Sequence, residues 1–143
     1  MDEAMPAPDS EAIYQVAVEF GDCDPAGIVY FPNFHRWMDA ASRHWFVVRG
    51  IPSWRDAEAR WGVIGTPIVD SQTKFMRPAV YGDKLQIETE VTEWRSKSFV
   101  QRHRIWRGPD LLVEGTEVRV FVARGAGGAG IRGVVVPEEI RAL

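Results

Sequence analysis

The sequence predicts an α+β fold, in which one long helix packs against an antiparallel sheet of five or six strands. Residues 33–49 carry a single amphipathic helical stripe, and almost every segment after Gly62 alternates apolar and polar residues with the period of a strand. Short connections between these segments are typical of an antiparallel meander with one exposed face. The helix must lie on the sheet, because no other element is available to bury its aromatic stripe.

Length, charge and cysteine content limit the classes of protein to which this chain can belong. With 143 residues we expect one domain, residues 11–143, behind a flexible leader, residues 1–10. A formal net charge of −3 gives no reason to expect a nucleic-acid partner. One cysteine cannot form an internal disulfide, and we therefore expect a cytoplasmic protein. No apolar stretch approaches the roughly 18 residues of a membrane-spanning helix, so no membrane partner is expected.

The predicted elements begin with a strand at residues 12–19, AIYQVAVE, whose alternation is loose. The long helix follows at residues 33–49. Pro32 fits its first position, where the missing N–H costs nothing, and Gly50 suits its C-terminal cap. A short second helix is expected between residues 52 and 61.

Strands are predicted for most of the remaining chain. Their expected ranges are residues 63–76, 84–94, 98–107, 117–123 and 133–136, followed by one helical turn at residues 137–143. In the segment EVRVFVA, residues 117–123, three valines alternate with Glu117, Arg119 and Phe121. The two sets are therefore expected on opposite faces of the sheet.

Two features that could indicate a cofactor or a reactive thiol have simpler structural explanations. Residues 124–133, RGAGGAGIRG, contain G-x-G-x-x-G, but a strand rather than a helix follows, so we expect a hairpin loop and no nicotinamide or flavin cofactor. The adjacent Asp22 and Asp24 disfavour a thiolate at Cys23, which is expected to pack as a small apolar residue. No cysteine and histidine residues have the spacing of a zinc site, and no metal is expected.

The loop EFGDCDPAGIVYFPN, residues 19–33, contains the first candidate for an active site. Asp22 and Asp24 are common turn residues, and taken alone they need no other explanation. Their position shortly before Pro32 adds a second interpretation, because the start of a helix carries partial positive charge and free N–H groups. A carboxylate that faces such a start can act as base or nucleophile while the N–H groups stabilise an oxyanion. Asp24 is therefore a candidate catalytic residue.

Two further charged groups each have a structural and a functional interpretation. Asp39 lies inside the long helix, where it could face solvent, pair with His35 four residues earlier, or accept a hydrogen bond from a bound ligand. Arg95 and Lys97 flank Ser96 in a break between two strands. Basic residues at a sheet edge discourage aggregation, but this pair could equally bind the phosphates of a nucleotide-bearing ligand.

The loop and the helix that follows it, EFGDCDPAGIVYFPNFHRWMDAASR, resemble the N-terminal signature of the 4-hydroxybenzoyl-CoA thioesterases, a family of the hotdog-fold superfamily. The wider acyl-CoA thioesterases share the looser pattern D-x-D-x-x-G-x-V-Y-x-x-N, present here from Asp22 to Asn33. Two further stretches, GVIGTPIVD and EWRSKSFVQRH, resemble the branch that acts on aromatic substrates. The resemblance runs from about Val18 to Phe121.

The resemblance implies a hotdog fold and a homodimer or homotetramer with active sites between subunits. It also implies hydrolysis of an aromatic acyl-CoA without a cofactor, with 4-hydroxybenzoyl-CoA as the expected substrate. Asp24 corresponds to the catalytic carboxylate, which acts as nucleophile or general base. Phe31 corresponds to the helix start whose N–H polarises the thioester carbonyl, and Asp39 to the aspartate that meets the 4-hydroxyl group.

Other parts of the substrate are assigned to residues by the same resemblance. Those expected beside the acyl group are Tyr30, Pro32 and Trp37. Those expected beside the CoA phosphates are Arg95, Ser96 and Lys97. Ser96 stands where close relatives carry an arginine, which implies a weaker phosphate contact. A hotdog hydratase or a non-catalytic acyl-CoA-binding domain is the alternative, although such a hydratase usually pairs a histidine with the aspartate.

Overall fold

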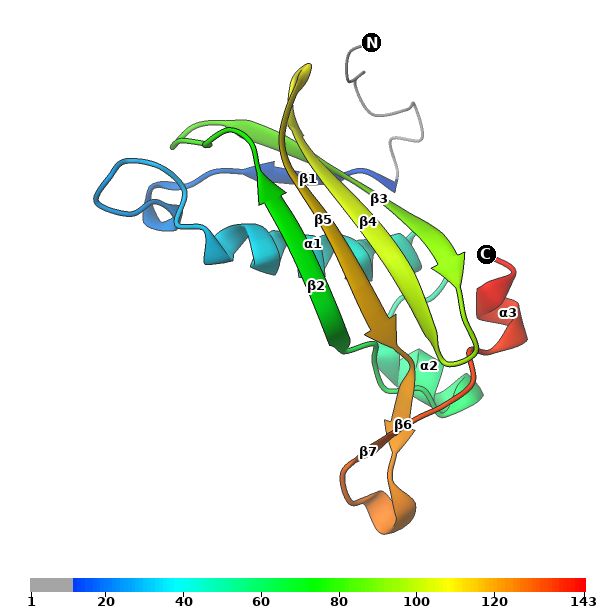
Figure 1. Cartoon of the computed structure of the whole chain (residues 1–143). Coiled ribbons are helices and arrows are strands. Elements are labelled where there is room, and N and C mark those ends of the chain that lie inside the picture. Colours follow the sequence, from blue (N-terminus) through cyan, green and yellow to red (C-terminus); the bar gives the residue numbers. More distant parts are fainter. Residues whose placement is uncertain (1–11) are drawn as a thin grey trace.

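A five-stranded antiparallel sheet curves around one long helix in this computed structural model, which describes residues 12–143 (Figure 1). The strands follow the spatial order β1-β3-β4-β5-β2. Their bounds are Tyr14–Ala17 for β1, Ile68–Phe75 for β2, Lys84–Trp94 for β3, Ser98–Arg107 for β4 and Asp110–Val120 for β5. The predicted α+β hotdog fold is confirmed. The predicted leader, residues 1–10, lies outside the described residues.

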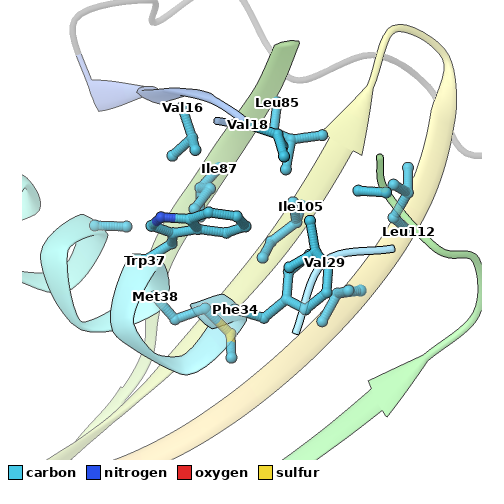
Figure 2. Close-up of a cluster of buried hydrophobic side chains, with 13 residues drawn as sticks. Val16, Val18, Val29, Phe34, Trp37, Met38, Leu85, Ile87, Ile105 and Leu112 are labelled. Carbon is cyan, nitrogen blue, oxygen red and sulfur yellow. The ribbon is translucent and has the colours of Figure 1, made fainter. Parts of the chain in front are cut away.

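The central helix α1, Pro32–Val47, buries one side against the sheet. Pro32 occupies the first helical position as predicted, and Gly50 follows the helix with a φ of 96°, a conformation that favours glycine. The buried stripe consists of Phe34, Trp37, Met38, Ala41, Ser42, Trp45 and Phe46. Figure 2 shows the first three aromatic and sulfur side chains of this stripe among the aliphatic side chains of the sheet. The predicted helix is confirmed, and its ends differ by no more than two residues.

The helix touches the sheet closely at Gly115 of β5. A Cβ atom at this position would lie 2.6 Å from Met38 Sδ, which is shorter than side-chain contacts allow. The absence of a side chain therefore lets α1 lie at this depth. The same face of β5 carries Glu117 and Arg119, and both are buried.

The polar half of the predicted alternation in β5 is the half that faces the core. Glu117, Arg119 and Phe121 are buried, whereas Val118 and Val120 are half-buried. Alternation correctly separated the two sets but did not indicate which of them faces the helix. Buried charged side chains need partners, and those partners form part of the site described below.

A short helix and a small hairpin extend the fold at one end of the sheet (Figure 1). Helix α2, Trp54–Trp61, begins where Ser53 Oγ accepts the Asp56 N–H at 3.0 Å, and it confirms the helix predicted between residues 52 and 61. Strands β6, Val122–Arg124, and β7, Ile131–Gly133, pair with each other. The glycine-rich segment joins them as the predicted hairpin loop, with one short 3-10 helix, η3, at Ala126–Gly128.

The end of the chain folds back onto the turn between β3 and β4. The strand predicted at residues 133–136 is wrong, because β7 ends at Gly133 and residues 134–136 run as irregular backbone. Helix α3, Glu138–Arg141, forms the predicted last helical turn. Within residues 12–143, no helix is long and apolar enough to cross a lipid bilayer.

Candidate active site

Asp22 closes the loop that precedes α1. It ends the 3-10 helix η2, Phe20–Asp22, and its Oδ2 accepts the Glu19 N–H at 2.9 Å. Its Oδ1 lies 3.3 Å from Arg36 Nη2, and its carbonyl oxygen accepts the Asn33 side-chain amide at 2.8 Å. Both carboxylate oxygens are thus used within the loop and the first turns of α1, which agrees with the turn interpretation of this residue.

Asp24 lies at the start of a tight turn and leaves part of its carboxylate accessible. Its N–H donates to the Ile28 carbonyl at 2.9 Å, and its own carbonyl accepts from Gly27, which has a φ of 84°. Oδ1 accepts the Ala26 N–H at 2.8 Å, while Oδ2 accepts no hydrogen bond from residues 12–143. The pocket beside this side chain has a volume of about 450 Å³ and is lined by Phe20, Gly21, Cys23, Asp24, Pro25, Gly27 and Tyr81. One carboxylate oxygen is therefore held, and the other is free to meet a substrate.

The start of α1 leaves one backbone N–H group without a partner, and this group belongs to Phe31. The Tyr30 N–H donates back to the loop at 2.9 Å, and the N–H groups of Asn33 and Phe34 donate to the carbonyls of Tyr30 and Phe31 at 2.9 and 3.0 Å. Pro32 has no N–H. The Phe31 N–H has no acceptor anywhere in the described part of the chain. A single donor at the positive end of the helix is therefore available to a ligand.

The aromatic residues predicted beside the acyl group have two different environments. Tyr30 and Phe31 are exposed, with ring centroids 5.8 Å apart, and the Phe31 ring also meets Phe75 edge-on at 6.2 Å. Trp37 is only 5% exposed and packs in the core between α1 and the sheet, as Figure 2 shows. Packing explains its presence, and a contact between Trp37 and a substrate stays a prediction. Pro32 begins the helix between these two groups.

Asp39 projects from the middle of α1 into a separate pocket. Its side chain is 68% exposed, and its Oδ1 accepts a hydrogen bond from Arg119 Nη2 at 3.0 Å. The alternative of a pair with His35 is not formed, because the His35 ring packs against Phe31 and Phe75. The pocket has a volume of about 490 Å³ and is lined by Asp39, Ala40, Ser42, Arg43, Trp54, Gly65, Thr66, Pro67, Ile68 and Arg119.

Arg119 belongs to a row of buried polar residues that crosses three strands. Its Nε and Nη2 both donate to Glu117 Oε1, at 3.0 and 2.8 Å. The same oxygen lies 2.7 Å from His103 Nε2, and the His103 Nδ1 lies 2.8 Å from the Thr89 hydroxyl. We call Thr89, His103, Glu117 and Arg119 the buried polar row. Sequence reasoning missed it, and the available signal was the charged half of the alternation in β5.

The ionisation of Glu117 reflects two opposing effects. Burial by itself would raise the pKa of this carboxyl group, because it disfavours the charged form. The hydrogen bond from His103 and the positive charge of Arg119 outweigh burial, so the pKa of Glu117 lies below its ordinary value of 4.5. Glu117 is therefore a carboxylate at neutral pH.

Folding stability is expected to fall in acid through Glu117. Because its pKa is lower in the folded than in the unfolded chain, the ionised group contributes stability above the unfolded value of 4.5, and this contribution declines as the pH falls toward the folded value. Chemical unfolding measured from about pH 5 to about pH 3 should show a steeper loss of stability in the native chain than in Glu117→Gln. Parallel losses in the two proteins would contradict this account.

The basic residues predicted to bind phosphates form the exposed turn between β3 and β4. Arg95 donates from Nε and Nη2 to the two carboxylate oxygens of Glu93, at 2.9 and 3.3 Å, and this contact lowers the pKa of Glu93. Lys97 forms no ion pair with the described residues. The turn backbone is held by the end of the chain, because Arg141 Nη2 donates to the Arg95 carbonyl at 2.8 Å.

The catalytic candidates and the basic turn lie far apart within one chain. Figure 1 shows the loop before α1 at one end of the helix and the turn between β3 and β4 near the other end, beside α3. The 16 residues of α1 span about 24 Å. Asp24, Phe31 and Asp39 line three different pockets. A single chain thus presents the predicted site residues as separate groups.

Cysteine and metal chemistry have little support from the described residues. Cys23 is half-buried, and its Sγ lies 3.9 Å from the Glu19 carbonyl oxygen in the wall of the Asp24 pocket. No three His, Cys, Asp or Glu side chains of residues 12–143 are grouped so that they could hold a metal ion.

The fold, the carboxylate loop and the exposed helix start together are the features of a hotdog thioesterase. The sequence profile of the thioesterase-like superfamily matches residues 18–143, and the chain belongs to this superfamily. Within it, the chain is 49% identical over 130 residues to the 4-hydroxybenzoyl-CoA thioesterase of Pseudomonas sp. strain CBS-3. That alignment covers 87% of this chain and 91% of the relative. The predicted family resemblance is confirmed.

Solved structures place the same family nearby. A crystal structure of an aspartate-to-asparagine mutant of 4-hydroxybenzoyl-CoA thioesterase, complexed with 4-hydroxybenzoyl-CoA, superimposes with a TM-score of 0.84 at 45% identity. This match covers 91% of this chain and 95% of that one. A gentisyl-coenzyme A thioesterase matches with a TM-score of 0.75 at 31% identity, over 91% of this chain and 96% of the other.

Proposed function

We propose that this protein is a thioesterase that hydrolyses an aromatic acyl-CoA, with 4-hydroxybenzoyl-CoA as its substrate, to the free acid and CoA. The observation that carries the proposal is the loop before α1, in which a half-accessible carboxylate and an unpaired helix N–H are built from one short segment. The identity of 49% to a 4-hydroxybenzoyl-CoA thioesterase supports the choice of acyl group.

The proposed chemistry divides between Asp24 and Phe31. The Phe31 N–H would donate to the thioester carbonyl oxygen and stabilise the oxyanion that forms on it. Asp24 would either attack the carbonyl carbon, expelling CoA as a thiolate and leaving a mixed anhydride for water to hydrolyse, or remove a proton from the attacking water. Both routes need the carboxylate ionised and one of its oxygens unencumbered, as Oδ2 is here.

The reaction is tested with a panel of acyl-CoA thioesters. Free thiol released on hydrolysis is followed with a thiol reagent, beside the absorbance of an enoyl-CoA. Rapid thiol release from 4-hydroxybenzoyl-CoA supports the proposal. Hydration of the enoyl-CoA without thiol release would make the protein a hydratase, and binding without either reaction would make it a non-catalytic acyl-CoA-binding domain.

Asp39 is proposed to accept the phenolic O–H of the acyl group. A charge-assisted hydrogen bond of this kind is worth about 1.5–3 kcal/mol. In Asp39→Ala, kcat/KM for 4-hydroxybenzoyl-CoA is expected to fall about 10- to 100-fold further than kcat/KM for benzoyl-CoA, which has no hydroxyl to lose a partner. Equal losses for the two substrates would remove this role.

The turn of Arg95, Ser96 and Lys97 is proposed to hold the phosphates of CoA. Exposed ion pairs are weak, so Arg95→Ala and Lys97→Ala are each expected to raise KM for the CoA thioester about 2- to 5-fold. The N-acetylcysteamine thioester of the same acid lacks the nucleotide and serves as the control substrate. Its KM should stay constant in both variants, and a matching rise would place the effect elsewhere.

We further infer a homodimer or homotetramer in which two chains complete each site. The separation of the catalytic loop from the basic turn within one chain supports this arrangement (Figure 1). So does the edge strand β2, which exposes Ile68, Val69 and Phe75 along a free edge. Light scattering of the purified protein measures its mass directly, and an active monomer would contradict the inference.

A further inference from the structure

We infer that Arg119 is a positioning residue for Asp39, and that the rest of the buried polar row holds Arg119 in place. The row would thereby set how strongly the site prefers an acyl group that carries a hydroxyl donor over one that does not. This inference rests on the proposed role of Asp39. It concerns residues of the sheet that touch no substrate themselves.

Asp39 depends on Arg119 for its orientation. An aspartate that is 68% exposed on a helix ordinarily rotates among several positions and is solvated in each. Here Oδ1 accepts from Arg119 Nη2 at 3.0 Å, whereas Oδ2 accepts no hydrogen bond from the described residues. The pair therefore directs one fixed oxygen and leaves the other available on the side of the 490 Å³ pocket.

Arg119 is rigid enough to do this because its guanidinium is almost fully engaged. It is only 4% exposed. Nε and Nη2 donate to Glu117, Nη1 donates to the Thr66 carbonyl at 3.0 Å, and the second hydrogen of Nη2 reaches Asp39. Four of the five N–H bonds of the side chain thus have partners. A planar fork held at three corners cannot follow Asp39, so Asp39 follows it.

The remaining members of the row hold Glu117. This carboxylate is 2% exposed, and a buried charge is stable only when it is paired and hydrogen-bonded. Arg119 supplies the opposite charge, and His103 Nε2–H donates to Oε1 when Thr89 donates its hydroxyl hydrogen to Nδ1. The row is anchored in the sheet, because Thr89 and His103 are register partners on β3 and β4.

The charge count of this group explains which ligand it favours. Arg119 and Glu117 cancel, so the carboxylate of Asp39 leaves one net negative charge at the pocket. Such a group accepts a hydrogen bond from a hydroxyl but repels a ligand that carries its own carboxylate there. Without Arg119 the carboxylate would keep its charge but lose its fixed direction.

The decisive measurement is the ratio of kcat/KM for 4-hydroxybenzoyl-CoA to kcat/KM for benzoyl-CoA. Arg119→Lys keeps the positive charge beside Glu117, so that a buried carboxylate is not left unpaired, but a single ammonium cannot bridge Glu117 and Asp39 in the same plane. We expect the ratio to fall about 3- to 10-fold in this variant. Thermal unfolding reports whether the variant is folded.

A double-mutant cycle separates positioning from a general loss of structure. If Arg119 acts through Asp39, Arg119→Lys should lower the ratio in the native background and leave it unchanged in Asp39→Ala. The matched control is Arg104→Lys, because Arg104 also pairs with a glutamate between β4 and β5, at 3.1 Å from Glu114, without reaching Asp39. Its ratio should equal that of the native protein.

The possible outcomes distinguish the inference from the proposed function. A lower ratio in both Arg119→Lys and Asp39→Ala supports the inference. A lower ratio in Asp39→Ala alone overturns the positioning role and leaves the proposed function intact. An unchanged ratio in both removes Arg119 and Asp39 together from substrate choice, while hydrolysis itself is judged separately through Asp24.

Discussion

Asp24→Asn is expected to lower kcat for thioester hydrolysis by about 10²- to 10⁴-fold and to leave the fold intact. An amide neither attacks a thioester nor removes a proton from water at neutral pH. The substitution is nearly isosteric, and the amide oxygen can still accept the Ala26 N–H that Asp24 Oδ1 accepts at 2.8 Å. Steady-state hydrolysis of 4-hydroxybenzoyl-CoA measures the loss, and circular dichroism with thermal unfolding measures the fold.

The matched control for this prediction is Asp22→Asn in the same loop. Asp22 holds the Glu19 N–H and Arg36, so its substitution should reduce stability but retain most of the turnover. Full activity of Asp24→Asn would refute the assignment of the catalytic residue. Finding ¹⁸O in the Asp24 side chain after a single turnover in labelled water would identify it as a nucleophile.

Phe31→Pro is expected to lower kcat by about 10²- to 10³-fold, because it removes the one unpaired N–H at the start of α1. The backbone already suits the substitution. Phe31 has a φ of −55°, which lies within the range of proline, and its N–H makes no hydrogen bond within the described residues that the change would break. The binding of a substrate analogue and the thermal midpoint should change much less than kcat.

The loss of the exposed aromatic ring could by itself affect the acyl group, and Phe31→Ala controls for this. The alanine variant loses the ring but keeps the N–H. If the N–H stabilises the oxyanion, Phe31→Ala should retain far more activity than Phe31→Pro. Equal losses in the two variants would assign the effect to the ring and leave the oxyanion donor unidentified.

Local pattern was sufficient where one segment determines both the element and its role. The steps of three and four between Phe34, Trp37, Met38 and Ala41 require a helix with one buried side, and α1 has that side. The loop around Asp24 was also readable, because its turn residues and Pro32 act within a few positions of one another. In both cases the interacting groups are neighbours in sequence.

The pair of Asp39 and Arg119 shows where sequence reasoning ended. Within the helix the nearest partner for Asp39 is His35, whereas the observed partner is 80 positions away on β5. Alternation in β5 separates two faces but cannot tell which one is covered, and the covered face carries the charges. Only the packing of α1 over Gly115 decides this, and such packing is a property of the whole fold.

The closure of the basic turn by the C-terminal segment has a consequence for the order of synthesis. The Ser96 carbonyl accepts the Val136 N–H at 2.9 Å, and the Arg95 carbonyl accepts Arg141 Nη2 at 2.8 Å. A nascent chain can pair β3 with β4 long before either donor leaves the ribosome. The catalytic loop therefore finds its helix early, whereas the turn proposed for the phosphates receives its last backbone partners only as translation of this segment finishes.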